Sequence, residues 1–358
     1  MSKKKDLVIF APNWSKNNPY QNLLADSISD KYEVKMQNYP AGLRPFTSLH
    51  KQNPNMTVLH LHWVAELIHR LSWSKSSLFF YIKLGLMLFD LWRLKKSGIK
   101  VIWTIHNKLS HQGLNKKREL LIRRQFCRLA DQIIIHSTEA MELVTKFYEY
   151  PLLQKAKVIF HGNYDNCYPK PSATKDSLRK SLNIKPDVIN ILYFGSIRPY
   201  KGVDNLIDCF NSIESTLENS SLTLAGGVSD ANYKNELSEK VKLNSKIVAN
   251  FEFLPEQQLV DQITAADIVV IPFADTLTSG STILAMTQGK PLILPEKARV
   301  FGCVPEQGVK YFANIAELTS VLQNIHTLPL QAMATTNRAA ALNLTWEKVG
   351  ALTKQCYS

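Results

Sequence analysis

The first half of the chain alternates short apolar runs with longer segments whose apolar residues recur at helical spacing. Leu7–Ala11 (LVIFA) is a nearly continuous apolar run, typical of a strand buried on both faces of a parallel sheet. Further strands are predicted at 32–37, 56–63, 100–105, 131–136 and 157–160. Helical or polar segments separate these runs, so the pattern predicts a doubly wound α/β domain with a parallel sheet.

The alternation restarts after a polar, proline-bearing stretch, with apolar runs at 191–194, 221–225, 248–253, 267–272 and 290–294. We therefore predict two Rossmann-like doubly wound domains that face a crevice. The predicted divisions are a first domain at 1–165, a linker with a short helix at 166–187, a second domain at 188–340 and a last helical segment at 341–358. A return of this last segment to the first domain is one option.

The balance of charge points to an anionic partner. Lys and Arg number 43 against 30 Asp and Glu, a formal net charge of +13 over 358 residues. Nucleic acid, an acidic membrane surface and a phosphorylated substrate all fit such an excess, and a basic host proteome is the plain alternative.

The five cysteines have no C-x-x-C spacing, which argues against a disulfide framework and a zinc site. With no signal peptide at Met1–Pro12, we expect a cytoplasmic protein.

One apolar run in the second half ends in a cationic loop. Ile191–Gly202 (ILYFGSIRPYKG) breaks at Gly195 and then presents Arg198 and Lys201. Ligands of open α/β sheets bind at the carboxyl ends of strands. The planar fork of Arg and the point charge of Lys together suit a diphosphate. A turn with two solvated cations is the alternative.

A run of small residues, Ser279, Gly280 and Ser281, precedes a predicted helix at 282–288. Small side chains at a helix start give a phosphate access to backbone N–H groups and to the positive end of the helix dipole. An N-cap serine without a ligand explains the same residues.

Polar residues also follow the apolar runs of the first half. In the loop after the first strand, Asn17, Asn18 and Tyr20 are candidate ligand contacts, although Asn18 also suits the cap of a helix with Pro19 at its first position. His60 and His62 share one face of a strand. They lack a nearby third ligand for a metal, so core packing or lining of the crevice is favoured.

Two further positions in the first half suit acid–base chemistry. His106, followed by Asn107, ends a strand, where a histidine serves as a base or bonds to backbone. Glu139 lies in the first turn of a helix capped by Ser137 or Thr138, and capping alone explains it. His161 closes the sixth predicted strand.

A long segment, 76–96, is apolar almost all round and is flanked by cations, including Lys75 and Lys100. Lys83 and Asp90 interrupt it, so it is a poor transmembrane span. It either lies on an anionic bilayer or is buried between the sheet and neighbouring helices. A basic, arginine-rich helix is predicted at 116–129.

The order and spacing of eight segments resemble the GT-B glycosyltransferases, over essentially the whole chain. The segments are HLHW (60–63), WTIHN (103–107), HS (136–137), FHGNY (160–164), YFGSIRPYKGVD (193–204), LAGG (224–227), AADIVVIPF (265–273) and TSGSTILAMTQGKP (278–291). They are similar to family-four-like bacterial transferases that build exopolysaccharides and cell-surface glycans, often on lipid-linked acceptors.

The resemblance implies roles for the residues singled out above. It places the donor diphosphate on Arg198 and Lys201, beside Gly195 and the Ser279–Ser281 turn. It places His106 near the sugar, and it implies no metal or other cofactor. The implied contacts with the acceptor or the crevice are Asn17, Asn18, Tyr20, His62, Asn107 and His161.

One departure from the family concerns the nucleotide. Members usually carry E-x7-E before A-M-x-x-G-K-P, and here those two positions hold Thr276 and Leu284. The second glutamate normally holds the ribose, for which Glu296 and Glu306 are candidate substitutes in this chain. Retention or inversion at the anomeric carbon stays open; for inversion, His106 is the first candidate base and Glu139 the second.

We therefore predict a transferase that moves a sugar from a UDP- or GDP-linked donor to a glycan or lipid-linked acceptor in bacterial polysaccharide biosynthesis. A non-catalytic nucleotide-binding subunit of a glycan-assembly complex and a nucleotide-sugar epimerase are the alternatives. Cations concentrate near 93–100 and 116–128, beside the apolar helix, rather than among exposed aromatics. This placement favours peripheral contact with the inner face of an anionic membrane over binding of nucleic acid.

Overall fold

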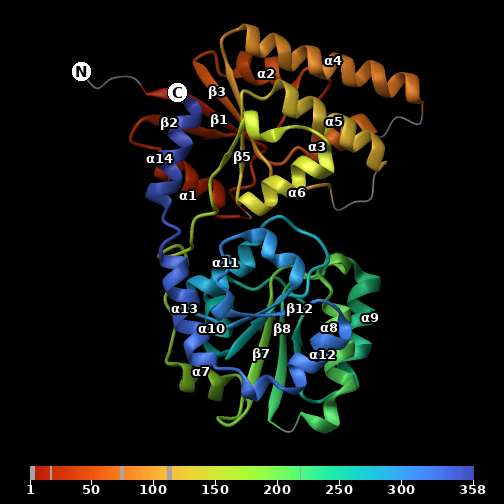
Figure 1. Cartoon of the computed structure of the whole chain (residues 1–358), viewed down its shortest axis with the longest axis vertical. Helices are drawn as coiled ribbons and strands as arrows, with labels where there is room; N and C mark the ends of the chain where they lie inside the picture. Colours follow the sequence, from red (N-terminus) through yellow and green to blue (C-terminus); the bar gives the residue numbers. More distant parts are fainter. Residues whose placement is uncertain (1–4, 17, 73–75, 111–114, 218) are drawn as a thin grey trace. The chain divides into compact units, whose positions relative to one another are not determined.

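The computed structural model of the protein describes residues 5–16, 18–72, 76–110, 115–217 and 219–358. The chain divides into two compact units, each built on its own parallel sheet (Figure 1). The first unit consists of Met1–Gly162, Val300–Gly302 and Thr345–Ser358. The second consists of Asn163–Arg299 and Cys303–Leu344.

The first unit holds a six-stranded sheet in the order β2-β1-β3-β4-β5-β6, with every neighbouring pair parallel. Its strands are β1 (Asp6–Ala11), β2 (Tyr32–Met36), β3 (Met56–Leu61), β4 (Lys100–Thr104), β5 (Gln132–Ile135) and β6 (Ala156–Val158). Its helices are α1 (Tyr20–Ser27), α2 (Pro45–Gln52), α3 (Ala65–Ser72), α4 (Ser77–Lys96), α5 (Lys116–Leu129), α6 (Thr138–Tyr148) and α14 (Trp346–Tyr357), with a 3-10 turn at Leu152–Gln154.

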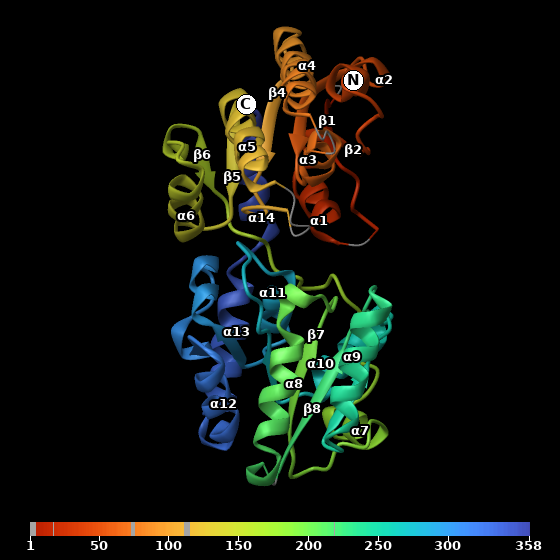
Figure 2. The same ribbon diagram turned by 90° about the vertical axis from the view of Figure 1, so that its right-hand side faces the viewer.

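The last helix of the chain packs beside the first in this unit (Figure 2). A Cβ added to Gly350 of α14 would lie 2.3 Å from the carbonyl oxygen of Ser27, so the two helices approach as closely as glycine allows. Buried side chains of α14, including Val349 and Cys356, complete the apolar core on this side of the sheet. A change at the end of the chain therefore acts directly on the first unit.

The second unit holds a six-stranded parallel sheet in the order β12-β11-β10-β7-β8-β9. Its strands are β7 (Ile189–Phe194), β8 (Ser220–Ala225), β9 (Ile247–Asn250), β10 (Ile268–Val270), β11 (Leu292–Pro295) and β12 (Val309–Phe312). Its helices are α7 (Lys175–Ser181), α8 (Val203–Ser212), α9 (Ala231–Lys242), α10 (Glu256–Ala265), α11 (Gly280–Thr287), α12 (Ile315–Gln323) and α13 (Leu330–Leu342). Further 3-10 turns are Pro199–Lys201, Glu214–Thr216, Glu296–Phe301, Glu306–Gly308 and Ile325–Thr327. The predicted fold of two Rossmann-like domains is confirmed.

Each sheet has a topological switch point, where the strands on either side are connected in opposite directions. In the first unit it lies between β1 and β3, and in the second between β7 and β10. Loops that leave such a pair diverge, and ligands of open α/β sheets bind outside the carboxyl ends of the strands at this place.

Three local predictions need correction. Strand β12 was not predicted, because Val309–Phe312 has only four residues and the two central ones, Lys310 and Tyr311, interrupt its apolar character. Helix α1 begins at Tyr20, with Pro19 as N-cap rather than first helical residue, while Asn18 Oδ1 accepts from the Tyr20 N–H at 3.0 Å. Helix α4 is neither wholly buried nor wholly exposed: it buries one face only.

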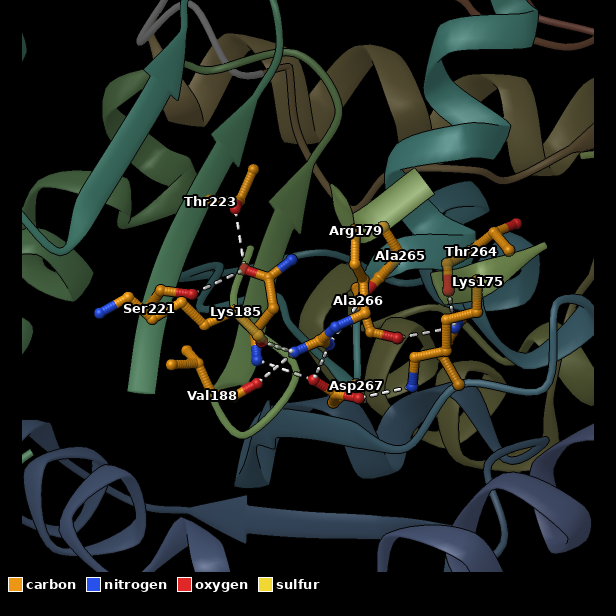
Figure 3. A network of polar contacts seen from close by, with 12 residues as sticks. Lys175, Arg179, Lys185, Val188, Ser221, Thr223, Thr264, Ala265, Ala266 and Asp267 are labelled. Atoms are coloured by element: carbon orange, nitrogen blue, oxygen red, sulfur yellow. Dashed lines mark hydrogen bonds and ion pairs between the residues drawn. The ribbon is translucent and has the colours of Figure 1, made fainter. Parts of the chain in front are cut away.

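A polar network fixes α7 to the amino-terminal ends of the strands of the second sheet (Figure 3). Asp267 accepts hydrogen bonds from Lys175 Nζ at 2.5 Å, Arg179 Nη1 at 2.7 Å and the Asn190 N–H at 2.8 Å. Burial alone would raise the pKa of the Asp267 carboxyl, but these bonds outweigh burial and lower that pKa. Arg179 is 5% exposed, so its charge depends on Asp267 for neutralisation.

We predict that Asp267→Ala lowers the free energy of unfolding by about 3–5 kcal/mol, because it leaves the Arg179 guanidinium buried without a carboxylate. Lys175→Met, whose ammonium is 45% exposed, is the matched control and costs under about 1 kcal/mol. Urea unfolding measures both.

Since the folded-state pKa of Asp267 is lowered, the contribution of this carboxylate to the free energy of unfolding is present above its unfolded-state pKa. The contribution is lost as pH falls through the folded-state pKa. Equal losses in the two variants would contradict this account.

Candidate functional site

Five buried histidines gather at the carboxyl edge of the first sheet. His60 lies in β3 and His62 directly after it, while His106, His136 and His161 follow β4, β5 and β6. Because neighbouring parallel strands end at the same edge, residues far apart in sequence meet here.

The Tyr20 ring from α1 also belongs to this cluster. Its centroid lies 5.0 Å from that of His106 and 4.9 Å from that of His161. Tyr20, His62, His106 and His161, all predicted from the sequence, are therefore brought together in one unit.

Hydrogen bonds fix the tautomers of three of these rings. His136 Nδ1 lies 2.9 Å from the Ile159 carbonyl oxygen, which only accepts, so Nδ1 carries the proton. Nε2 of neutral His136 is then the acceptor for His106 Nδ1–H at 3.3 Å. By the same rule, His106 Nε2 accepts from His62 Nδ1–H at 3.3 Å. The three rings thus donate in one direction, from His62 to His106 and from His106 to His136. The unprotonated Nε2 of His62 has no hydrogen-bond partner among the described residues.

Burial keeps these histidines neutral. It lowers the pKa of His62 and of His106 well below the ordinary value, and neighbouring histidines lower both further. Burial also lowers the pKa of His60 and of His161 to about 3. The pKa of His136 falls to about 4 by burial, opposed by its bond to the Ile159 carbonyl.

His60 has a structural role beside this row. Its Nδ1 lies 2.6 Å from the Tyr357 hydroxyl and its Nε2 lies 2.7 Å from Thr104 Oγ1. Both ring nitrogens are thus bonded, and the histidine ties α14 to β3 and β4. In the part of the chain that the structure describes, no group of three or more His, Cys, Asp or Glu residues is arranged to hold a metal ion.

The remaining predicted residues of the first unit lie outside this row. Asn18 is occupied with the Tyr20 N–H, and the Asn107 carbonyl accepts from Arg123 Nη1 at 3.0 Å. Glu139 is exposed in the first turn of α6, whose cap is Ser137 Oγ. Asn17 lies outside the described residues.

In the second unit, two glycines allow the loops after β7 and β8 to approach closely. A Cβ on Gly226 would lie 1.9 Å from the Gly195 carbonyl oxygen, and Gly195 itself has φ +110°, which L side chains rarely adopt. A Cβ on Gly195 would lie 2.9 Å from Ser281 Oγ. Gly195 and Ser281, predicted separately from the sequence, are therefore adjacent.

The cationic loop lies at the switch point of this sheet. A Cβ on Gly202 (φ +69°) would lie 2.4 Å from the Pro272 carbonyl oxygen, and the Ala274 N–H donates to the Tyr200 carbonyl at 2.9 Å. These contacts join the loop after β7 to the loop after β10. The predicted position of the cationic motif, outside the carboxyl end of a strand, is therefore observed.

Arg198 and Lys201 carry the positive charge of this loop. Arg198 is exposed and Lys201 half-buried. No carboxylate of the described residues lies within ion-pair distance of either cation. Burial, and then the charge of Arg198, lowers the pKa of the Lys201 ammonium. Two neighbouring cations without a counter-ion form a site that an anion stabilises.

Helix α11 begins beside this loop with the predicted small residues. Ser279 Oγ accepts from the Thr282 N–H at 3.2 Å, which makes it the N-cap, and its own hydroxyl hydrogen stays available for donation. The N–H groups of Gly280 and Ser281 lie in the first turn, where a helix supplies no partner for them. The arrangement can hold an anion with neutral donors in addition to the two cations.

The candidate substitutes for the ribose-binding glutamate are already paired. Glu296 and Glu306 both form ion pairs with Arg299, and all three side chains are largely exposed. The Arg299 guanidinium lies 4.0 Å from the centroid of the Tyr311 ring, which fixes its place. The contact between Arg299 and Tyr311 could not be predicted from the sequence, because Tyr311 belongs to β12, the strand that was not predicted.

Comparison with known proteins adds three kinds of likeness. Residues 174–299, which include Arg198, Lys201 and the Ser279–Ser281 turn, match the profile of the family described as "Glycosyl transferases group 1". The chain is 23% identical over 284 residues to the GDP-mannose:glycolipid 4-beta-D-mannosyltransferase of Xanthomonas campestris pv. campestris, a match that covers 79% of this chain and 71% of that protein.

Two solved structures resemble the fold over nearly the whole chain. Sucrose-phosphate synthase from Thermosynechococcus elongatus matches with a TM-score of 0.76 at 16% identity, covering 99% of this chain and 98% of that one. Anabaena Alr3699/HepE in complex with UDP-glucose matches with a TM-score of 0.73 at 15% identity, covering 98% of each chain.

We predict that His62, His106 and His136 all carry their proton on Nδ1 at neutral pH. Free histidine side chains lack the Ile159 carbonyl that imposes this tautomer here. Long-range ¹H–¹⁵N correlation spectra of histidine-labelled protein distinguish the two tautomers, and His136→Phe, which removes the accepting nitrogen, should release His106 from the Nδ1–H form. An Nε2–H signal from His106 in the wild type would contradict the assigned direction of the row.

Proposed function

We propose that the chain is a GT-B glycosyltransferase that moves a sugar from a nucleoside diphosphate donor to a glycan or lipid-linked acceptor during synthesis of a bacterial surface polysaccharide. The family match, the Xanthomonas relative and the fold support this proposal. The observation that carries it is the pair Arg198 and Lys201 at the switch point of the second sheet, next to the start of α11 and without an ion-paired carboxylate among the described residues.

The proposed donor site acts on the leaving group. As the bond between the anomeric carbon and the diphosphate breaks, negative charge grows on the phosphate oxygens. Arg198, Lys201 and the first N–H groups of α11 are fixed donors that stabilise that charge without reorganisation. No resident metal or cofactor is part of this proposal. The relatives differ in nucleotide, because one name specifies GDP-mannose and one structure holds UDP-glucose, so both donor classes belong in the test.

We assign the acceptor proton to His106. The bond from Nδ1–H to His136 orients the ring and leaves Nε2 as the accepting nitrogen, the arrangement by which a third group positions a base. An acceptor hydroxyl that replaces the His62 N–H at Nε2 gives its proton to His106. Its oxygen then bonds to the anomeric carbon, and the electron pair of the broken bond stays on the diphosphate. Glu139, exposed and outside the row, is the second candidate.

We assign the nucleotide ribose to Glu306. Its ion pair with Arg299 holds the carboxylate in a defined place in the segment between β11 and β12. The two positions that carry glutamates in the resembling family do not serve here. Leu284 is buried in α11, and Thr276 Oγ1 donates to the Thr278 carbonyl at 2.7 Å.

The presence of Thr276 and Leu284 in place of the two glutamates favours one alternative function, a nucleotide-binding subunit without turnover. Such a protein binds the nucleotide and never releases sugar, whereas an epimerase of this fold converts donor without an acceptor. Product analysis with and without acceptor separates all three functions.

The kind of acceptor determines whether the protein must contact a membrane. Within the described residues, no helix is both long and apolar enough to cross a bilayer. For a lipid-linked acceptor, we propose that the protein acts from the cytoplasmic side, in peripheral contact with the inner face of an anionic membrane. The glycolipid acceptor in the name of the Xanthomonas relative supports this proposal.

We predict that Arg198→Ala and Lys201→Ala each lower turnover by about two orders of magnitude, the scale of losing one preorganised donor to developing charge. Lys310→Ala removes an exposed cation from β12 and serves as the control. Thermal shifts with UDP and GDP should show stabilisation of the wild type and of Lys310→Ala that is lost in the two loop variants. Near wild-type transfer by either folded loop variant would remove the basis of the proposed donor site.

The assignment of the base has its own test. We predict that His106→Gln lowers kcat by about 10²–10⁴-fold, the usual contribution of a general base, with little effect on donor KM. Glu139→Gln should leave kcat near the wild-type value. The reverse result would transfer the role of base to Glu139.

A further inference from the structure

Helix α4 packs on one side only. Its inner face, which includes Phe80, Leu84, Met87 and Leu91, is buried against neighbouring helices, among them α2 and α5. Its outer face is equally apolar and is uncovered in the described part of the chain. The outer residues are between 43% and 68% exposed: Leu78, Phe79, Tyr81, Ile82, Leu86, Phe89 and Trp92. We call these seven residues the α4 face.

The α4 face is a continuous strip rather than a scatter of single residues. It holds seven of the fifteen large apolar side chains that the described chain exposes. Spacings of three and four residues from Leu78 through Ile82, Leu86 and Phe89 keep them on one side of the helix. At a rise of about 1.5 Å per residue, the strip is about 21 Å long. An apolar strip of this length on a soluble domain marks a binding surface.

The charges that α4 and its neighbour α5 carry are mostly positive, although Lys95 and Arg124 pair with Asp131 and Glu149 of other segments. Helices α4 and α5, which pack side by side, together carry ten Lys and Arg residues and two acidic residues. Both acids are buried and occupied. Asp90 accepts from the Phe46 N–H at 2.8 Å, and Glu119 pairs with Arg123 at 2.8 Å. Neither helix therefore presents an exposed carboxylate.

Aromatic rings and cations alternate at the carboxyl end of α4. The rings of Phe89 and Trp92 stack with centroids 5.5 Å apart, and Lys96 Nζ lies 5.6 Å from the centroid of Trp92. Arg93 is exposed in the same turn. Trp and Phe beside Lys and Arg are the side chains that amphipathic helices place at the boundary of headgroups and acyl chains.

We propose that the α4 face is a membrane-docking surface that lies in the plane of an anionic bilayer. The seven apolar side chains enter the boundary between headgroups and acyl chains, and Lys83, Arg93 and Lys96 meet lipid phosphates. A second copy of the chain fits less well, because two α4 faces would bring cations against cations, whereas an anionic bilayer neutralises them. The purpose of this contact, which is access to a lipid-linked acceptor, rests on the proposed function. The binding of the α4 face to a bilayer does not rest on it.

The test is co-sedimentation of the full chain with vesicles of phosphatidylcholine, alone and mixed with phosphatidylglycerol. We expect binding to the mixed vesicles that weakens as salt is raised. The double variant Phe89→Ser/Trp92→Ser should reduce partitioning by about tenfold or more, and Arg93→Ser/Lys96→Ser should abolish the preference for anionic lipid. Leu243→Ser/Phe253→Ser removes two apolar side chains of the second unit that are more exposed than Phe89 and Trp92, and it should have no effect.

Two results would overturn the proposal. One is wild-type partitioning by the Phe89/Trp92 variant. The other is a concentration-dependent dimer in light scattering that this variant abolishes, together with no vesicle binding by the wild type, which would make the face a contact between copies. Stabilisation by UDP or GDP in all variants monitors the donor site separately. Vesicle binding without donor turnover would therefore refute the proposed function alone, and donor turnover without vesicle binding would refute the docking surface alone.

Discussion

Both candidate sites depend on the parallel register of the strands. Neighbouring strands in a sheet lie about 4.8 Å apart and, when parallel, end at the same edge. In the first unit, His62, His106 and His136 follow three adjacent strands, and their ring centroids are 5.6 and 5.2 Å apart, close to that spacing. The sheet therefore sets the separation at which one imidazole donates to the next. A different strand order would separate these rings.

The carboxyl edges of the two sheets differ in their electrostatics: the first holds neutral histidines and the second holds two cations. In the first, burial holds the titratable groups neutral, and a backbone carbonyl at Ile159 fixes the position of the protons along the row. In the second, no carboxylate of the described residues forms an ion pair with Arg198 or Lys201, and burial lowers the pKa of the Lys201 ammonium. A neutral accepting nitrogen suits the removal of a proton from a hydroxyl. Unneutralised cations suit a diphosphate.

Much of this arrangement was predicted from the sequence, because it follows from local patterns. Apolar or alternating runs predicted eleven of the twelve strands, and glycine followed by cations predicted the loop at the end of β7. The missing strand, β12, has no such run. The partners of the histidines were also beyond local patterns. Tyr357 reaches His60 across 297 residues, and only the packing of α14 on the first sheet brings it there. The one-sided burial of α4 likewise depends on its neighbours, since the helix itself is apolar all round.

In the proposed reaction, this chain uses a nucleotide sugar as donor and needs an acceptor. The most direct measurement is the release of nucleoside diphosphate from UDP-glucose, UDP-N-acetylglucosamine and GDP-mannose by the purified protein, with and without a bacterial lipid extract. The account predicts release from one of these donors that depends on the extract, together with a radiolabelled sugar in the lipid phase. Conversion of donor without extract, or binding of nucleotide with no release from any donor, would contradict it.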